Sequence, residues 1–408
     1  MKILTLNCGS SSIKFKIFDM PDGSVLLKGQ ADRIGKDDAL IKWEGQGIKP
    51  TSMNKKLSDH REALEILLGQ DAAGNDGFPV NTRDIAAVGH RVVHGGEFFH
   101  SSVVINPSVR KTLEDCRNLA PLHHPHNLTG IDICTSFIPN VPQVAVFDTA
   151  FHQTLPDFAY TYAIPYRYYE ENRIRKYGFH GISHRYVAER AGKILGMDIK
   201  RLRIITAHLG NGSSICAVAQ GKSCDTTMGF TPLSGVVMGT RSGDIDPALV
   251  AYLIKSMNIP AEKAMHILNN ESGVLGISGL SSDFRDLVTA AEQGHERAGL
   301  ALKVYAYSVA RGIGSLIPAI GGLDVLVFTA GIGENSPDMR SRICDFLPWL
   351  GVRLDSAKNL SGTPERDIST QDAPVRILVI PTDEEKMIAL ETMGILKNDS
   401  LPSNADSP

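Results

Sequence analysis

Two segments rich in glycine and serine have the composition of loops that bind phosphate groups. One is ILTLNCGSSSIK at residues 3–14, and the other is IITAHLGNGSSI at residues 204–215. In each, apolar and β-branched residues precede the turn, and apolar residues follow it. Glycine lets a backbone approach a ligand closely, and successive N–H groups in such a turn bind anions. Either segment alone is equally compatible with an ordinary β-hairpin. The repetition favours a duplicated fold that holds one polyphosphate from both sides.

The histidine-rich segment His123-His124-Pro125-His126 resembles a metal site at first sight. The proline and the adjacent spacing make joint ligation by these imidazoles awkward, so we do not expect zinc here. His90 and His94 are four residues apart, but Val92-Val93 and the glycines after His94 favour a strand. The two rings then need not face one metal, and we expect no metal site built from histidines.

The bulk composition is that of a globular protein with no general affinity for polyanions. The chain has 408 residues, a formal net charge of −3, 42% hydrophobic residues and 21% charged residues. This length predicts about two or three domains. The charge indicates no partner nucleic acid or anionic membrane, and no apolar run is long enough for a membrane span. Six cysteines without a C-x-x-C pair, and no signal peptide, favour a reduced protein in the cytoplasm.

The elements that would position the first loop are strands. Leu4, Leu6 and then 13, 15 and 17 are apolar, whereas Lys14 and Lys16 alternate with them. This pattern predicts a hairpin with one buried face. A helix is predicted at 61–69, and further strands are predicted at 86–93 and 144–147.

In the second half, helix signals are clearer. Asp246-Pro247 has the composition of an N-cap followed by proline at the first helical position. Residues 297–317 predict a long buried helix. A buried strand at 324–329 leads into the glycine-rich turn 330–335, after which Ser336-Pro337 begins another helix. A glycine-rich turn between a strand and a helix is a suitable place for part of a nucleotide.

Ten stretches, in order along the chain, resemble the acetate and propionate kinase family, which belongs to the duplicated actin-like phosphotransferases. The resemblance covers residues 1 to about 395, with no departure at a functional position. The stretches are LNCGSSSIK (6–14), GHRVVHGG (89–96), APLHHPHN (120–127), FDTAFH (147–152), YGFHGISH (177–184), AHLGNGSS (207–214), DTTMGFTPLSGVVMGTRSGDIDP (225–247), SSDFRD (281–286), FTAGIGEN (328–335) and PTDEE (381–385).

The resemblance implies an α/β fold: two-lobed, duplicated, actin-like (ribonuclease H-like), with a central cleft. The first lobe would be residues 1–150 plus 385–408 with the C-terminal helix, and the nucleotide-binding lobe would be residues 151–384. The implied activity is reversible, in-line transfer of the ATP γ-phosphoryl group to acetate, giving ADP and acetyl phosphate. The implied cofactors are ATP or ADP with Mg²⁺, which Mn²⁺ can replace, and the implied assembly is a homodimer.

Phosphoryl transfer to a carboxylate needs cations to hold two anions together. Arg91 and Arg241 fit this task, because each lies among glycines and arginine's planar fork suits carboxylate and phosphoryl oxygens. Without the resemblance, a surface or helix-capping role would be the commoner one for each. The resemblance places His180 at the equatorial oxygens of the transferring group, whereas a lone histidine is more often a packed core residue.

The resemblance makes Asp148 catalytic, yet acetate is already ionised at neutral pH and has no proton to give. We therefore expect Asp148 to act in the magnesium shell or by orienting an arginine. Asn7 and Glu384 match the family's magnesium positions, although Glu384 is also explained as a carboxylate at a helix start.

The remaining site residues also come from the resemblance. Those for acetate are Arg91, Val93, Leu122, Phe179 and Pro232, of which the last four would form a small apolar pocket for the methyl group. Those for the nucleotide are Lys14, His208, Leu209, Gly210, Asn211, Gly212, Asp283, Phe284, Arg285, Gly331, Ile332, Gly333, Glu334 and Asn335. Because one methylene is worth only about 1–3 kcal/mol in such a pocket, propionate should be a poorer but real substrate.

Three alternatives remain: a propionate kinase of the same family, a non-metabolic actin-like ATPase, and a sugar or glycerol kinase on the same fold. An ATPase of that kind needs no carboxylate site, and a sugar kinase needs an aspartate base and a polar pocket. The paired arginines and the apolar lining argue against both.

Overall fold

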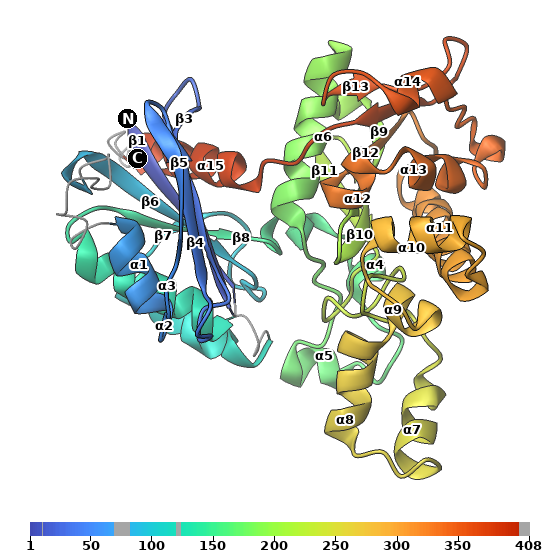
Figure 1. The fold of residues 1–408 in the computed structure, drawn as a ribbon, viewed down its shortest axis with the longest axis horizontal. Coiled ribbons are helices and arrows are strands. Elements are labelled where there is room, and N and C mark those ends of the chain that lie inside the picture. Colours follow the sequence, from blue (N-terminus) through green and yellow to red (C-terminus); the bar gives the residue numbers. More distant parts are fainter. Residues whose placement is uncertain (10, 69–81, 120–123, 400–408) are drawn as a thin grey trace, which may run out of the picture. The chain divides into compact units, whose positions relative to one another are not determined.

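The computed structural model describes residues 1–9, 11–68, 82–119 and 124–399 (Figure 1). The chain divides into two compact units, Met1–Ala150 with Asp383–Pro408, and Phe151–Thr382. We call them the first unit and the second unit. Each contains one mixed β-sheet on which helices pack. Within the described ranges, no helix has the length and apolar character needed to cross a membrane.

The first unit is built on a sheet with the strand order β5-β4-β3-β2-β1-β6-β8-β7. Its strands are β1 (Lys2–Cys8), β2 (Ser12–Asp19), β3 (Ser24–Asp32), β4 (Leu40–Gly45), β5 (Ile48–Asn54), β6 (Ile85–Val92), β7 (Val103–Val104) and β8 (Gln143–Phe147). Its helices are α1 (His60–Leu68), α2 (Pro107–Asp115), α3 (His124–Phe137) and α15 (Glu384–Asp399). The helix predicted at 61–69 and the strands predicted at 86–93 and 144–147 are therefore confirmed, with small differences at their ends.

The predicted N-terminal hairpin is also confirmed. β1 and β2 pair antiparallel, with Asn7 opposite Lys14. Leu4, Leu6 and the apolar residues of β2 at 13, 15 and 17 are buried against α1 and α3. The alternate residue Lys14 is exposed and Lys16 is half-buried. The period-two pattern of the sequence therefore determines which side of the sheet is covered.

Helix α15 packs on the opposite face of the same sheet, where Ala389 joins a cluster with Ile3 and Phe18. Gly89 makes this approach possible. A Cβ atom there would collide with Thr392 Oγ1 and would lie 2.6 Å from Ile388 Cγ2, both on α15. Because Gly89 has no side chain, α15 can pack closely against β6, the strand that carries Arg91.

The second unit has a sheet with the strand order β11-β10-β9-β12-β14-β13. Its strands are β9 (Arg203–Leu209), β10 (Ser213–Ala219), β11 (Lys222–Thr226), β12 (Val325–Thr329), β13 (Arg366–Asp367) and β14 (Arg376–Val379). Its helices are α4 (Asp157–Tyr160), α5 (Arg167–Asn172), α6 (Gly181–Leu195), α7 (Pro247–Lys255), α8 (Ala261–His266), α9 (Gly273–Ser278), α10 (Phe284–Glu292), α11 (Glu296–Ile320), α12 (Ala330–Asn335), α13 (Pro337–Cys344) and α14 (Ser356–Leu360).

The two sheets share one topology. In the first unit, β3-β2-β1 are antiparallel neighbours, and β6 and β8 then continue parallel to β1. In the second unit, β11-β10-β9 are antiparallel neighbours, and β12 and β14 continue parallel to β9. The predicted duplication is therefore confirmed, and each glycine-serine segment forms the turn of the first hairpin of its unit.

Most of the elements predicted in the second half are confirmed. Asp246 caps α7 by accepting a hydrogen bond from the backbone N–H of Ala248. Helix α11 contributes buried residues along most of its length, and β12 is fully buried. The predicted glycine-rich turn at 330–335 is wrong, because these residues form the short helix α12. Near its end, the carbonyls of Gly333 and Glu334 accept hydrogen bonds from the buried Arg340 guanidinium.

Candidate active site

Arg91 and Asp148 lie at the ends of two neighbouring parallel strands of the first unit, β6 and β8. Arg91 Nε donates to Asp148 Oδ1 at 2.9 Å, and Nη2 donates to Oδ2 at 2.6 Å. The Asp148 side chain is 2% exposed and that of Arg91 is 19% exposed. A bidentate pair of this kind fixes the direction of the guanidinium plane.

Asn7 and Glu384 complete a cluster around Arg91. Nη1 of Arg91 donates to Asn7 Oδ1 at 3.4 Å, and Nε lies 4.0 Å from Glu384 Oε2. Asn7 is on β1, next to β6, and Glu384 is the first residue of α15. Four residues far apart in the sequence, all singled out through the resemblance, are thus brought together within the first unit.

The charges in this cluster shift the pKa values of its members. Burial opposes the charged form of Arg91, but Asp148 and Glu384 outweigh it, and the pKa of Arg91 is raised. The pKa of Glu384 is also raised, first by burial and then by the negative charges of Asp148 and Glu385, although Arg91 and Lys14 act in the opposite direction. Negative charge at Glu384 is therefore incompletely compensated.

A magnesium ion fits this donor set. Mg²⁺ binds oxygen ligands, retains several waters and uses few carboxylates, so one amide oxygen and one carboxylate are sufficient. Burial is the largest cause of the raised pKa of Glu384, and added positive charge would oppose both burial and the negative charges of Asp148 and Glu385. Within the described residues, no group of three or more His, Cys, Asp or Glu side chains is arranged to hold a metal. Asn7 and Glu384 are the residues that would hold the ion.

Val93 follows β6 and is 9% exposed. Its N–H donates to Asn127 Oδ1 at 3.0 Å, and Asn127 Nδ2 donates to the carbonyl of Cys8 at 3.0 Å. Asn127 therefore ties the end of β6 to the first glycine-serine turn. Asn127 lies in the quoted stretch 120–127, but nothing in its type or spacing singles it out from the sequence. Leu122, from the same stretch, lies outside the described residues.

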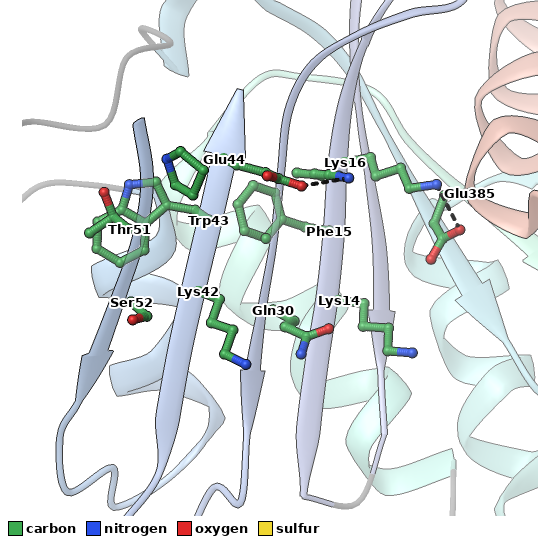
Figure 2. A pocket seen from close by; sticks show the side chains of 13 residues that line it. Lys14, Phe15, Lys16, Gln30, Lys42, Trp43, Glu44, Thr51, Ser52 and Glu385 are labelled. Carbon is green, nitrogen blue, oxygen red and sulfur yellow. Dashed lines mark ion pairs between the residues drawn. The ribbon is translucent and has the colours of Figure 1, made fainter. Parts of the chain in front are cut away.

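Lys14 lies on the exposed face of β2, where it lines a cavity of about 530 Å³ (Figure 2). Gln30 is opposite Lys14 on β3, and Lys42 is opposite Gln30 on β4. Lys16, on the same strand, pairs with Asp383 at 2.9 Å and with Glu385 at 3.3 Å. Lys14 belongs to the first unit, whereas the other residues expected to bind the nucleotide belong to the second unit. Lys16 was not singled out from the sequence.

His180 immediately precedes α6 and has a left-handed backbone conformation, with φ 58°. Its Nδ1 lies 2.8 Å from Ser214 Oγ, and its ring stacks on that of His208 with centroids 4.1 Å apart. His208 Nδ1 lies 2.8 Å from Ser183 Oγ, whose oxygen is 2.8 Å from Thr382 Oγ1. Both predicted histidines are therefore ordered by hydroxyl groups.

Arg241 lies close to His180 through the second glycine loop. A Cβ atom on Gly212 would be 3.4 Å from Arg241 Nη1 and 3.6 Å from His180 Cε1. Arg241 Nη1 donates to the Pro232 carbonyl at 3.4 Å, and no carboxylate pairs with Arg241 among the described residues. Burial lowers the pKa of Arg241 below its ordinary value. A partly buried guanidinium with no anion beside it is suited to an anionic ligand.

A cavity of about 860 Å³ in the second unit brings together residues from three of the quoted stretches. Asp283 caps α10 through the N–H of Arg285 and forms a bidentate pair with the Arg285 guanidinium. The expected nucleotide residues that line the cavity are Asn211, Asp283, Phe284, Arg285, Gly331, Ile332 and Asn335.

Other predicted residues of the second unit have structural surroundings. Leu209 is buried in the core. The Glu334 carboxylate accepts hydrogen bonds from Thr382 N at 3.0 Å and from Thr329 Oγ1 at 3.5 Å, which joins α12 to the end of the unit. Phe179 is 2% exposed, and its carbonyl lies 3.0 Å from His152 Nε2.

Comparison with known proteins agrees with these placements. A profile described as the Acetokinase family matches residues 2–390. The acetate kinase of Thermoanaerobacter pseudethanolicus is 54% identical over 398 residues, which cover 97% of this chain and 99% of that protein. The crystal structure of Porphyromonas gingivalis acetate kinase has a TM-score of 0.90 and 44% identity, covering 97% of this chain and 99% of that one. A propionate kinase from Francisella tularensis has a TM-score of 0.90 and 41% identity, with the same coverage. The chain belongs to the acetokinase family.

Proposed function

We propose that the chain is an acetate kinase, which transfers the γ-phosphoryl group of ATP to acetate and catalyses the reverse reaction. The relatives reported above that are named acetate kinase are 54% and 44% identical, and the propionate kinase is 41% identical. The observation that carries the proposal is the buried bidentate pair of Arg91 with Asp148, with Asn7 and Glu384 beside it. This arrangement presents an oriented cation to an anionic acceptor.

In the proposed reaction, an acetate oxygen forms a bond to the γ-phosphorus while the bond to the β–γ bridging oxygen breaks. The bond electrons leave with ADP, and no proton has to move, because acetate is already ionised. The protein therefore contributes mainly by positioning its ligands and neutralising charge. Arg91 and Arg241 would bind the acceptor and the transferring group, and His180 would donate to an equatorial oxygen.

Asp148 would act by orienting Arg91. Both of its oxygens accept hydrogen bonds from that guanidinium, and its side chain is almost completely buried. A carboxylate engaged in this way is poorly placed to accept a proton from a ligand. This favours the positioning role over a general-base role.

Asn7 and Glu384 would hold Mg²⁺, for which Mn²⁺ can substitute. When bound, the ion would offset negative charge on the phosphate oxygens. For ATP or ADP, the cavity lined by Asp283, Phe284 and the residues of α12 would hold the nucleoside. The second glycine loop with His208, and Lys14 of the first unit, would contact the phosphates.

Val93, Leu122, Phe179 and Pro232 would surround the acetate methyl group. Val93 and Phe179 are buried, and Pro232 is half-buried. An apolar lining of this kind would discriminate against a longer acyl chain by volume, not by hydrogen bonding. We therefore expect propionate to be used, but less efficiently than acetate.

We also propose a homodimer, in which α7 contributes to the interface. This helix has the sequence PALVAYLIK, yet none of its residues is buried, and Leu249 and Tyr252 are 50% and 57% exposed. An apolar helix left open in this way is typical of an association surface. Leu249→Glu with Tyr252→Glu should shift the protein to a monomer in light scattering. A dimer that survives both changes would exclude α7.

Hydroxylamine trapping of acetyl phosphate tests the activity directly. Purified protein with ATP, Mg²⁺ and acetate should give acetohydroxamate, and propionate should give less of its own hydroxamate. ATP hydrolysis that is independent of acetate, without hydroxamate, would instead favour a non-metabolic actin-like ATPase. Phosphorylation of a sugar or glycerol, without formation of hydroxamate, would favour a sugar or glycerol kinase.

A further inference from the structure

Within the second unit, a chain of hydrogen-bonded side chains connects His180 to Ser214, His184 and Thr206. His180 Nδ1 lies 2.8 Å from Ser214 Oγ, and the same oxygen lies 2.8 Å from His184 Nε2. His184 Nδ1 then lies 2.7 Å from Thr206 Oγ1. Thr206 is on β9, Ser214 is on β10 and His184 is on α6, so three packed elements fix the geometry.

The inner part of this chain is fully buried. Thr206, His184 and Ser214 are each 0% exposed. Burial, followed by the nearby imidazoles of His152 and His208, holds the pKa of His184 well below its ordinary value. His184 is therefore neutral, with a proton on only one of its two ring nitrogens, so it donates at one end and accepts at the other.

Ser214 makes the two imidazoles interdependent. Its hydroxyl group has one proton, so it can donate to only one of the two rings while it accepts from the other. If His184 Nε2–H donates to Ser214, the serine donates to His180 Nδ1, and the proton of a neutral His180 is then on Nε2. If the direction is reversed, the proton of His180 is on Nδ1.

An anionic oxygen in front of His180 favours the first direction, because that direction leaves an N–H at Nε2. Arg241 and His180 both lie within 4 Å of the position that a Cβ atom would occupy on Gly212. A cation this close disfavours a second positive charge on His180. A neutral His180 can still donate to an anionic oxygen from Nε2, provided that Nδ1 accepts a hydrogen bond. The first direction then uses the single Thr206 proton for His184 Nδ1 at 2.7 Å, instead of for the Cys216 carbonyl at 3.4 Å.

We propose that Ser214 is a positioning residue which, with His184 behind it, holds neutral His180 in the Nε2–H tautomer, so that the ring offers an N–H donor to a phosphoryl oxygen. The catalytic value of this arrangement rests on the role of His180 in the proposed function. The tautomer is tested separately from that role, because it can be measured in the protein without substrates.

Nitrogen-15 NMR of the histidine rings tests the tautomer in the full chain. The chain has 13 histidines, so the His180 signals are assigned by their loss in His180→Asn. In the unaltered protein, Nε2 of His180 should be protonated and Nδ1 should show the shift of a hydrogen-bonded acceptor. In Ser214→Ala, that acceptor shift should disappear and the two tautomers should exchange. Ser214→Thr, which keeps a hydroxyl group, should preserve it.

Ser223→Ala is the matched control. Ser223 is also buried at 0% exposure, and its Oγ lies 2.8 Å from the imidazole of His152, not from that of His180. The His180 signals should not change in this variant. His184→Phe is the second test, because it removes the donor behind Ser214 while leaving Ser214 in place. It should release the tautomer in the same way.

Turnover gives the second readout. In Ser214→Ala, kcat should fall by about 10- to 100-fold, as when the group that orients a metal-binding imidazole is removed. KM for ATP should change little. A His180 found with its proton on Nδ1 in the unaltered protein, or signals that do not respond to Ser214→Ala, would overturn the proposal. Loss of the tautomer with unchanged kcat would instead remove His180 from the proposed function and leave the tautomer assignment intact.

Discussion

Arg91 and Asp148 are joined through both oxygens of the aspartate, at 2.9 Å to Nε and 2.6 Å to Nη2 of the arginine. The carboxylate is the more buried partner, with 2% of its side chain exposed against 19% for the arginine. The pair therefore presents the guanidinium outward from a fixed base. Among the residues that the structure describes, Arg241 has no carboxylate anchor and contacts the Pro232 carbonyl, so the two arginines are expected to respond differently to substitution.

Asp148→Asn tests whether the aspartate orients Arg91. An amide retains one acceptor oxygen but places an NH₂ group against a guanidinium donor, so the bidentate geometry is lost. Turnover should fall by about 10²-fold or more, while ATP affinity changes much less. If magnesium is also a target of the charge, a higher magnesium concentration should recover part of the activity.

The pH profile separates this role from general-base catalysis. A base would leave an acidic limb in kcat/KM that is set by its own pKa. Loss of that limb in Asp148→Asn, together with no response to magnesium, would restore the proton-acceptor interpretation.

Arg241→Ala should lower turnover by about 10³-fold or more, as for other arginines that stabilise phosphoryl transfer. Arg241→Lys should recover only a small part, because an ammonium lacks the planar fork. Arg201→Ala, at an exposed arginine of the same unit, is the control and should retain normal turnover. Near-normal rates in a folded Arg241→Ala protein would remove the proposed role.

Val93→Ala should enlarge the acyl pocket and shift relative kcat/KM toward propionate by up to about 1–3 kcal/mol. The neighbouring Val92 is the matched control, because it is 0% exposed and packs in a separate apolar cluster of the first unit. Val92→Ala should lower the free energy of unfolding without changing the acetate/propionate ratio. An unchanged ratio in Val93→Ala would mean that other residues line the pocket.

The sequence was sufficient to predict elements whose pattern is local. The alternation of apolar and polar residues in β2 predicted which of its faces is buried, and Asp246-Pro247 predicted where α7 begins. The glycines at 330–335 indicated a turn, but they form a helix, and the carbonyls of Gly333 and Glu334 accept hydrogen bonds from Arg340 of the next helix, α13. A local composition rule cannot anticipate a hydrogen-bond donor supplied by another element.

The same limit applies to the site. Residues with an unusual local setting, such as Arg91 among glycines, could be singled out from the chain. Ser214 and Asn127 could not, because serine and asparagine are common and their value here comes from contacts made across elements. Ser214 contacts His180 and His184, which precede it in the chain by 34 and 30 residues. Such pairings follow from topology, not from spacing.

Three buried histidines predict how stability depends on pH. Burial lowers the pKa of His90 to about 4, that of His94 to about 3, and that of His184 well below the ordinary value of 6.5. Below pH 6.5 the unfolded chain takes up protons that the folded state does not. The contribution of each neutral histidine to the free energy of unfolding is therefore fully present above pH 6.5. It is lost as the pH falls from 6.5 toward about 4 for His90 and toward about 3 for His94.

The limiting slope is about 1.4 kcal/mol per pH unit for each histidine. Urea unfolding at several pH values between 7.5 and 5 measures it. His90→Gln removes one of the titrating rings, so its slope should be shallower by up to that amount, whatever its absolute stability. Equal slopes for the two proteins would show that His90 takes up its proton while folded.

Gly89→Ala tests the contact that positions Glu384. The added methyl group would collide with Thr392 and would lie 2.6 Å from Ile388 Cγ2, so α15 must shift away from β6. Overpacking of this kind should lower the free energy of unfolding by about 1–3 kcal/mol. Because Glu384 begins α15, the magnesium concentration needed for half-maximal activity should also rise.

Gly394→Ala is the matched control on the same helix. No atom lies within 4 Å of the position its Cβ would occupy, so alanine should stabilise the helix by about 0.5–1 kcal/mol and leave the magnesium requirement unchanged. Urea unfolding and magnesium titration of both variants give the comparison. If Gly89→Ala lost stability but kept the normal magnesium requirement, the packing of α15 on β6 would not control the position of Glu384. If it lost neither, the close approach of α15 at Gly89 would not contribute to the fold.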